Sequence, residues 1–156
     1  METIPMETMR DSPRWAVILC GGRGTRLGPF TQDVPKPLVS VAGKPILDYI
    51  FTKLIEYGFD RLVLPVGYLG NQIVRFAREY PFPAGTQCHV LDTGLDTPIG
   101  ARLAQIRHLL PEGEDFLLTN GDLIFDFDLR KFGQAHCRDR RTVTLPRRPS
   151  APPSAC

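Results

Sequence analysis

The residues with the clearest chemical potential lie in the stretch "LCGGRGTRLGPFTQDVPKPL", Leu19 to Leu38. Gly21, Gly22 and Gly24 leave backbone N–H groups open to an approaching anion, because no side chain obstructs them. Arg26 adds a fork of donors whose geometry suits phosphate oxygens. These residues predict a loop that binds a phosphorylated ligand.

Lys36 extends this prediction to a second phosphate. It stands between two prolines, so stiff backbone holds a compact positive charge in one place. Two common phosphate-binding patterns do not fit the stretch. A dinucleotide fingerprint needs glycine where Leu27 stands, and a P-loop needs Ser or Thr after Lys44 but has Pro45. The loop therefore requires another explanation than either pattern.

The elements around the loop alternate between strand and helix patterns. Apolar, β-rich runs predict strands at 15–19, 61–66 and 87–92, at the run before the "TNGD" turn, and at "TVTL" (142–145). Helical spacing predicts helices from Pro45 to a stop at Gly58, and over 71–80, 100–110 and 129–139. The apolar stripe of the first helix is expected to contain Ile46, Leu47, Ile50, Leu54 and Ile55.

This alternation predicts an α/β fold, a Rossmann-like doubly wound and mainly parallel sheet with helices on both faces. In such sheets the ligand lies beyond the carboxyl ends of the strands. The glycine loop and the "TNGD" turn, which contains Asp122, both follow strands. We therefore expect these two distant segments to converge.

The stretch "GGRGTRLGPFTQDVPKPLVSVAGKPIL" resembles the signature of the sugar-1-phosphate nucleotidyltransferases. The resemblance continues through "GYLGNQI", "LDTG", "TPIGARL" and "LLTNGDLIF" and covers roughly 15–145. It implies that a sugar 1-phosphate attacks the α-phosphorus of a nucleoside triphosphate and displaces pyrophosphate. Because that nucleophile is already an anion, catalysis reduces to alignment and charge neutralisation.

The resemblance also implies roles for individual residues. Asp122 corresponds to the family carboxylate that binds catalytic Mg²⁺, whereas on its own an Asp in such a turn usually only forms the turn. Asp126 and Asp128 are better explained by a half-exposed strand or a helix N-cap at Asp128 than by a second metal pair. The implied catalytic residues are Arg26 and Lys36, and the implied nucleotide-binding residues are Gly21, Gly22, Gly24, Thr25, Thr93 and Gly100. The segment "DTG" followed by Arg102 and Leu103 favours the cytidylyltransferase branch, and hence CTP.

Composition sets the outer bounds. With 156 residues and 42% hydrophobic content, the chain supports one ordinary core. We expect a flexible segment over 1–14, a partial nucleotide-binding domain over 15–145, and a disordered Arg- and Pro-rich tail over 146–156. The four cysteines have no metal-ligand spacing, and no apolar run is long enough for a membrane span. The sequence thus predicts a cytoplasmic protein with no membrane partner.

Several alternatives stay open. Family members are longer, so the chain is expected to be C-terminally truncated, either active or only nucleotide-binding. A regulatory relative that binds nucleotide without turnover and a molybdopterin-type nucleotidyltransferase are rival predictions. The net charge is +2, but 138–156 holds five Arg and one Asp, so the rest carries −2, and nucleic-acid binding is not expected. The oligomeric state is undecided, with a homo-oligomer as one alternative.

Overall fold

The computed structural model describes residues 14–24, 28 and 31–146. The described residues divide into two units, a larger one up to Asp126 and a smaller one from Phe127 to Pro146. The segments predicted to be flexible or disordered lie outside the described residues except for Arg14 and Pro146. Arg14 is anchored in the larger unit: its carbonyl accepts from the N–H groups of Asp60 and Arg61, and its guanidinium pairs with the Asp60 carboxylate.

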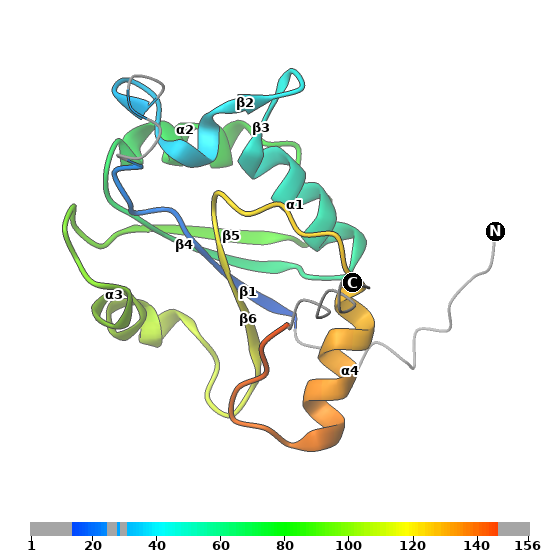
Figure 1. Ribbon diagram of the computed structural model, residues 1–156. Helices are drawn as coiled ribbons and strands as arrows, with labels where there is room; N and C mark the ends of the chain where they lie inside the picture. The colour runs from blue at the N-terminus through cyan, green and yellow to red at the C-terminus, as the bar shows by residue number, and fades with distance from the viewer. Residues whose placement is uncertain (1–13, 25–27, 29–30, 147–156) are drawn as a thin grey trace, which may run out of the picture. The chain divides into compact units, whose positions relative to one another are not determined.

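A four-stranded parallel sheet forms the centre of the larger unit, in the order β5-β4-β1-β6 (Figure 1). Its register places Val17 opposite both Val63 and Leu118. The strand predictions for this unit are confirmed, and the bounds are β1 (Trp15–Leu19), β4 (Arg61–Val66), β5 (Gln87–Asp92) and β6 (Phe116–Asn120). A two-stranded antiparallel ribbon, β2 (Ser40–Val41) and β3 (Lys44–Pro45), follows a 3-10 turn at Lys36–Leu38.

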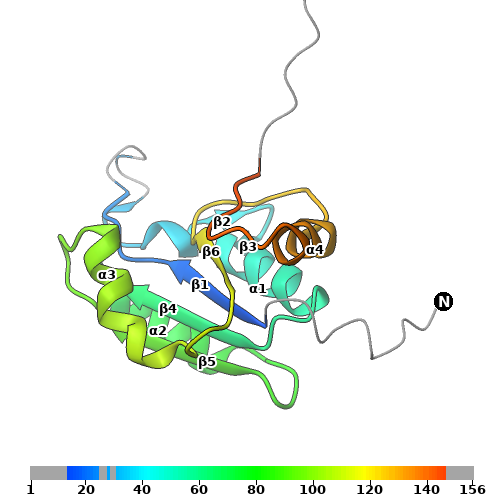
Figure 2. The ribbon, with the colours of Figure 1, turned by 90° about the horizontal axis from the view of Figure 1, so that it is seen from below.

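Helices cover both faces of this sheet, which confirms the doubly wound α/β architecture. Figures 1 and 2 show α1 (Ile46–Glu56) and α2 (Gly70–Glu79) on one face and α3 (Ile99–Ile106) on the other. A 3-10 turn, Arg107–Leu109, continues α3 toward β6. Since each crossover joins parallel strands, the loops that follow β1, β4, β5 and β6 all emerge at the same edge of the sheet.

The described residues pack against both faces of the sheet. On the α3 face, Ile106 packs against Val17 and Val63, and all three are fully buried. On the other face, Phe51 of α1 stacks with Phe76 of α2 at a ring-centroid distance of 6.0 Å. Both clusters are apolar and close-packed, so they fix the strands whose ends carry the loops.

The stripe predicted for α1 differs from its buried face at one position. Phe51 is fully buried, whereas Ile55 is only partly buried. The period of 3.6 residues allows either position beside Leu47 and Leu54. Position 51 is the buried one because its aromatic ring belongs to a group of rings that fills the space between α1 and α2. The ring centroids in this group lie 4.7–6.0 Å apart. These rings belong to Phe51, Phe76, Tyr80 and Phe82.

The smaller unit contains α4 (Leu129–Asp139), as the sequence predicts. Asp128 is its N-cap, since its carboxylate accepts from the N–H groups of Arg130 and Lys131 at 2.9 and 3.3 Å. The strand predicted at 142–145 is wrong: the segment is irregular, and Val143 and Leu145 are exposed. A strand needs a hydrogen-bonded neighbour, and the described residues pair none with this segment.

No helix among the described residues combines the length and the apolar character that crossing a membrane requires.

Candidate functional site

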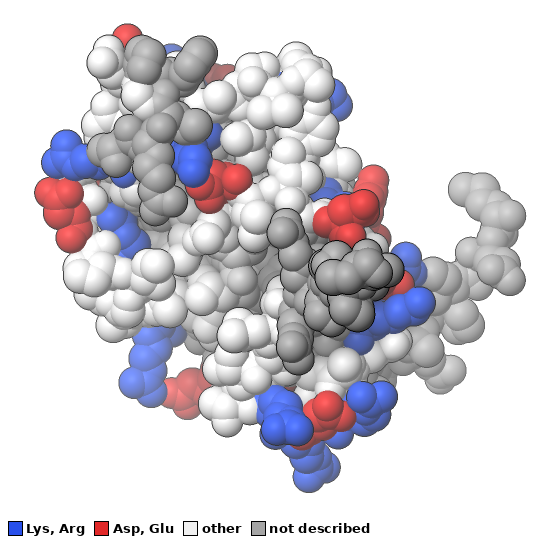
Figure 3. Space-filling view, in the orientation of Figure 1, with Lys and Arg blue, Asp and Glu red and all other residues white. Residues whose placement is uncertain are grey.

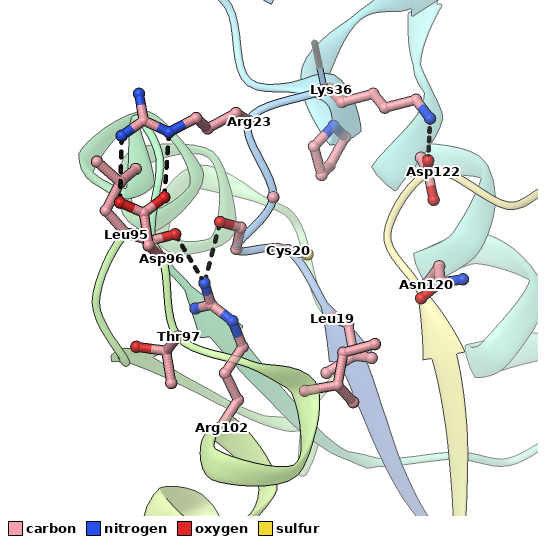
Figure 4. A pocket seen from close by; sticks show the side chains of 15 residues that line it. Leu19, Cys20, Arg23, Lys36, Leu95, Asp96, Thr97, Arg102, Asn120 and Asp122 are labelled. Atoms are coloured by element: carbon pink, nitrogen blue, oxygen red, sulfur yellow. Dashed lines mark hydrogen bonds and ion pairs between the residues drawn. The ribbon is translucent and has the colours of Figure 1, made fainter. Parts of the chain in front are cut away.

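A pocket of about 600 Å³ opens where the parallel strands end. Its walls come from three separate stretches of the sequence, 19–37, 95–102 and 120–122, which confirms that the glycine loop and the "TNGD" turn converge (Figure 4). The lining consists of residues 19–24 at and after the end of β1, 36–37 in the 3-10 turn, 95–97, 99 and 102 around the start of α3, and 120 and 122 at and after the end of β6.

Arg102 forms the floor of this pocket between three strand ends. It is only 5% exposed, and its guanidinium donates to the carbonyls of Gly21, Val66 and Leu95 at 3.0–3.2 Å. It also donates to Thr93 Oγ1 at 2.5 Å. Because these acceptors lie at the end of β4 or in the loops after β1 and β5, one side chain fixes three strand ends relative to one another.

The guanidinium also explains why residue 21 is glycine. A Cβ atom at Gly21 would lie 2.2 Å from Cζ of Arg102, well inside any allowed contact. Arg102 has no carboxylate partner among the described residues, and its contacts are carbonyl and hydroxyl oxygens. The pocket floor therefore carries a positive charge that no described acidic side chain neutralises.

Two ion pairs lie at the sides of the pocket (Figure 4). The first joins Arg23 of the glycine loop to Asp96, with nitrogen–oxygen distances of 3.2 and 3.3 Å. This hydrogen bond raises the pKa of Arg23 above its ordinary value. Arg23 also lies over the Tyr68 ring, 6.0 Å from its centroid. Basic and acidic side chains lie side by side on the face drawn in Figure 3 as well.

The second ion pair joins Lys36 Nζ to Asp122 Oδ2. Lys36 begins the 3-10 turn, in which Leu38 N–H donates to the Pro35 carbonyl at 2.8 Å and Pro37 is buried. Its backbone is therefore held, while its side chain remains about one-third exposed.

Gly121 brings Asp122 close to this turn. Its N–H donates to the Leu19 carbonyl at 2.9 Å, and a Cβ at this position would lie 2.6 Å from Cys20 Sγ and 3.1 Å from Pro37 Cγ. Glycine is needed here because the turn after β6 packs directly against β1 and the Lys36 turn. The convergence of Lys36 and Asp122 thus depends on a residue without a side chain.

The predicted site residues occupy different places. Gly21, Gly22, Gly24, Lys36 and Asp122 line the pocket, whereas Gly100 lies exposed in the first turn of α3 outside the lining. Arg26 and Thr25 lie outside the described residues.

Thr93 lies below the pocket. It is buried, and its hydroxyl donates to the Val66 carbonyl at 2.8 Å while accepting from Arg102. Its side chain therefore supports the floor.

Asp122 is the residue that could hold a metal ion. The described part of the chain contains no group of three His, Cys, Asp or Glu side chains suited to one. A single carboxylate still fits Mg²⁺, which commonly takes one or two carboxylates and completes its shell with phosphate oxygens and water. The donor set therefore suits a metal that arrives with a phosphorylated ligand.

Among the lining residues that sequence reasoning did not name as candidates, three carry a charge: Arg23, Asp96 and Arg102. A signal existed for Arg102, because it precedes Ile106 by one helical turn and so occupies the core-facing side of α3. An arginine at such a position requires buried acceptors. No comparable pattern in the sequence indicates the pairing of Arg23 with Asp96.

Comparison with known proteins agrees with this geometry. The family model described as nucleotidyl transferase matches residues 15–155. A probable glucose-1-phosphate cytidylyltransferase of Bacillus subtilis (strain 168) is 35% identical over 133 residues, covering 73% of this chain and 52% of the relative. The chain therefore spans about half the length of that relative.

Two solved structures are also similar. HddC from Yersinia pseudotuberculosis complexed with GMP-PN has a TM-score of 0.64 and 28% identity, over 78% of this chain and 53% of its own. CTP:phosphocholine cytidylyltransferase (LicC) from Streptococcus pneumoniae has a TM-score of 0.56 and 31% identity, over 69% of this chain and 44% of its own. With the family model matching nearly the whole chain, we conclude that it belongs to the nucleotidyl transferase family.

Proposed function

We propose that this chain binds a nucleoside triphosphate, with CTP favoured, and takes part in nucleotidyl transfer to a sugar 1-phosphate. The observation that carries the proposal is the meeting of the glycine loop, Lys36 and Asp122 around one pocket. The B. subtilis relative, named as a probable glucose-1-phosphate cytidylyltransferase, supports both the base and the acceptor. LicC, named for phosphocholine, makes a different phosphorylated acceptor the main alternative.

In this proposal the loop after β1 binds the triphosphate. Backbone N–H groups near Gly21, Gly22 and Gly24 face the phosphates, and Thr25 and Arg26 extend that contact. Gly100, at the first turn of α3, is retained as a nucleotide-binding candidate, and Thr93 contributes through Arg102. The uncompensated charge of Arg102 favours an anion over the pocket floor.

Lys36 has the central role in the transfer itself. The acceptor phosphate is already an anion, so the chain supplies no side-chain nucleophile and instead aligns the reacting groups. Lys36 reduces the repulsion between the acceptor and the α-phosphate, and Arg26 stabilises the departing pyrophosphate. When bound, Mg²⁺ on Asp122 would supply further charge neutralisation at the phosphate oxygens.

A second candidate function is nucleotide binding without turnover. The observation that favours it is the share of the B. subtilis relative that this chain spans, 52%. In that case the pocket binds its nucleotide and no transfer to an acceptor follows.

Calorimetry with CTP, UTP, dTTP and GTP in Mg²⁺ tests the proposal. We expect CTP to bind most tightly, and Lys36→Ala and Asp122→Asn each to weaken binding by about tenfold or more, since charge-assisted contacts are worth about 1.5–3 kcal/mol. Lys44→Ala and Asp48→Asn are matched controls, because these residues form an ion pair outside the pocket lining. No nucleotide binding by the folded chain would refute the proposal.

Pyrophosphate release then separates the two candidate functions. Release with glucose 1-phosphate supports the transferase, and release with phosphocholine alone would replace the sugar acceptor. Binding without release from either acceptor supports the nucleotide-binding function.

A further inference from the structure

We propose that Lys36 is the internal counter-ion of Asp122 in the nucleotide-free chain, and that it keeps divalent cations off this carboxylate until a triphosphate draws the ammonium away. The first half concerns only the free chain, whereas the second half rests on the proposed function. The observation behind both is the ion pair between Lys36 Nζ and Asp122 Oδ2.

The surroundings make this pair effective. Side chains of Lys36 and Asp122 are 32% and 29% exposed, so water screens their interaction less than that of a fully exposed pair. The other carboxylate in the pocket lining, Asp96, is paired with Arg23. A cation that enters the free pocket therefore meets no lining carboxylate without a basic partner.

The formal charge of the described lining also disfavours a free cation. The charged side chains among the described lining residues are Arg23, Lys36 and Arg102 against Asp96 and Asp122, an excess of one positive charge. This excess disfavours a free divalent cation and favours a polyanion such as a triphosphate. A metal ion that is already bound to a triphosphate enters as part of a net anion, which this lining attracts.

Lys36 can change partners without a change of fold. Its backbone is held by the 3-10 turn and by the flanking prolines, whereas its four-carbon side chain is flexible. The pocket is also lined by Gly22 and Gly24 of the glycine loop. Moving the ammonium from Asp122 to a phosphate would free the carboxylate at the moment when phosphate oxygens are available to complete a metal shell.

Titration with Mn²⁺, followed by electron paramagnetic resonance of the free ion, tests the first half without nucleotide. We expect the wild-type chain to bind Mn²⁺ weakly and Lys36→Met to bind it about tenfold more tightly or better, because the competing cation is gone. Lys44→Met is the matched control, since it makes the same charge change at an exposed lysine paired with Asp48, and it should bind like the wild type. Lys36→Gln provides a second neutral variant if Lys36→Met does not fold.

Two further results are decisive. The double variant Lys36→Met with Asp122→Asn should bind Mn²⁺ as weakly as the wild type. That result would assign the tighter Mn²⁺ binding of Lys36→Met to the Asp122 carboxylate. The inference is overturned if the folded neutral variants bind Mn²⁺ no better than Lys44→Met, or if the gain survives Asp122→Asn.

Adding CTP tests the exchange. In the wild type we expect CTP to tighten Mn²⁺ binding beyond what CTP achieves in solution, and Asp122→Asn should remove this effect. CTP binding without such tightening would overturn the exchange. A folded chain that binds no nucleotide would refute the proposed function, while the titrations without CTP would still decide the counter-ion role.

Discussion

Replacing Gly21 by alanine should destabilise the chain through Arg102 and not through the backbone of the loop. A Cβ at this position would lie 2.2 Å from Cζ and 2.2 Å from Nη1 of Arg102. Gly21 is not among the residues with positive φ, so alanine fits its backbone. The guanidinium must therefore move, and it is held by hydrogen bonds to buried acceptors.

The magnitude follows from the bonds that would be lost. The Val66 carbonyl keeps the Thr93 N–H and hydroxyl as donors at 2.9 and 2.8 Å, so losing its hydrogen bond from Arg102 costs little free energy. The Gly21 carbonyl keeps only a 3.4 Å contact from the Tyr68 N–H. Hydrogen bonds to charged groups contribute about 1.5–3 kcal/mol each, and release of a buried charge offsets part of this. We expect Gly21→Ala to lower the free energy of unfolding by about 2–3 kcal/mol.

A double-mutant cycle provides the assay, with urea unfolding followed by circular dichroism. In an Arg102→Met background the clash with the guanidinium is absent, so Gly21→Ala should cost less than about 0.5 kcal/mol there. Gly22→Ala is the matched control, because a Cβ at Gly22 meets no atom of the described residues within 4 Å. Arg107→Met, at an exposed arginine after α3, controls for the loss of charge. Equal stability of Gly21→Ala and Gly22→Ala, or strict additivity with Arg102→Met, would refute the reasoning.

Three further predictions concern the scaffold. Ile106→Ala should lower the free energy of unfolding by about 2–5 kcal/mol because the fully buried Ile106 side chain would leave a cavity between α3 and the sheet, and a loss under about 1 kcal/mol in urea unfolding would contradict that packing. Burial raises the pKa of the Cys88 thiol to about 12 and also raises the pKa of the Cys20 thiol, so alkylation mapped by mass spectrometry at pH 8.5 should label both far faster in the unfolded chain. The contribution of the two buried thiols to the free energy of unfolding should be complete below about pH 8.5. It should fall as pH rises toward the folded pKa, because the thiols of the unfolded chain ionise first. Cys88→Ala should make this fall smaller. Asp128→Ala should destabilise α4 by about 0.5–2 kcal/mol, measured by hydrogen exchange of its first turn, whereas Asp126→Ala should not.

Local patterns in the amino-acid sequence are enough to predict the parallel sheet of the larger unit and the two loops that meet at the carboxyl ends of its strands. Apolar runs of strand length and helical spacing are local properties, so four strands and four helices were predictable within a few residues. Because parallel strands end at one edge, the order of elements was enough to predict that the glycine loop and Asp122 would meet.

Periodicity was insufficient where packing selects between local choices. In α1, Phe51 is buried and Ile55 is not. Phe51 packs against the aromatic rings of Phe76 in α2 and of Tyr80 just after it. The segment 142–145 has a strand-like composition but no strand partner among the described residues. A strand ladder is a property of two segments, and one segment does not reveal it.

The arrangement of charges in the pocket arises only once the chain has folded. The sequence alone named Lys36 and Asp122 as candidates and the structure places both in the pocket lining, but their pairing in the free chain was not predictable. Arg23 meets Asp96 across 73 positions, and Arg102 meets the Gly21 carbonyl across 81. Such contacts depend on the side-chain positions that the folded sheet and helices impose, and no local pattern in the sequence encodes them.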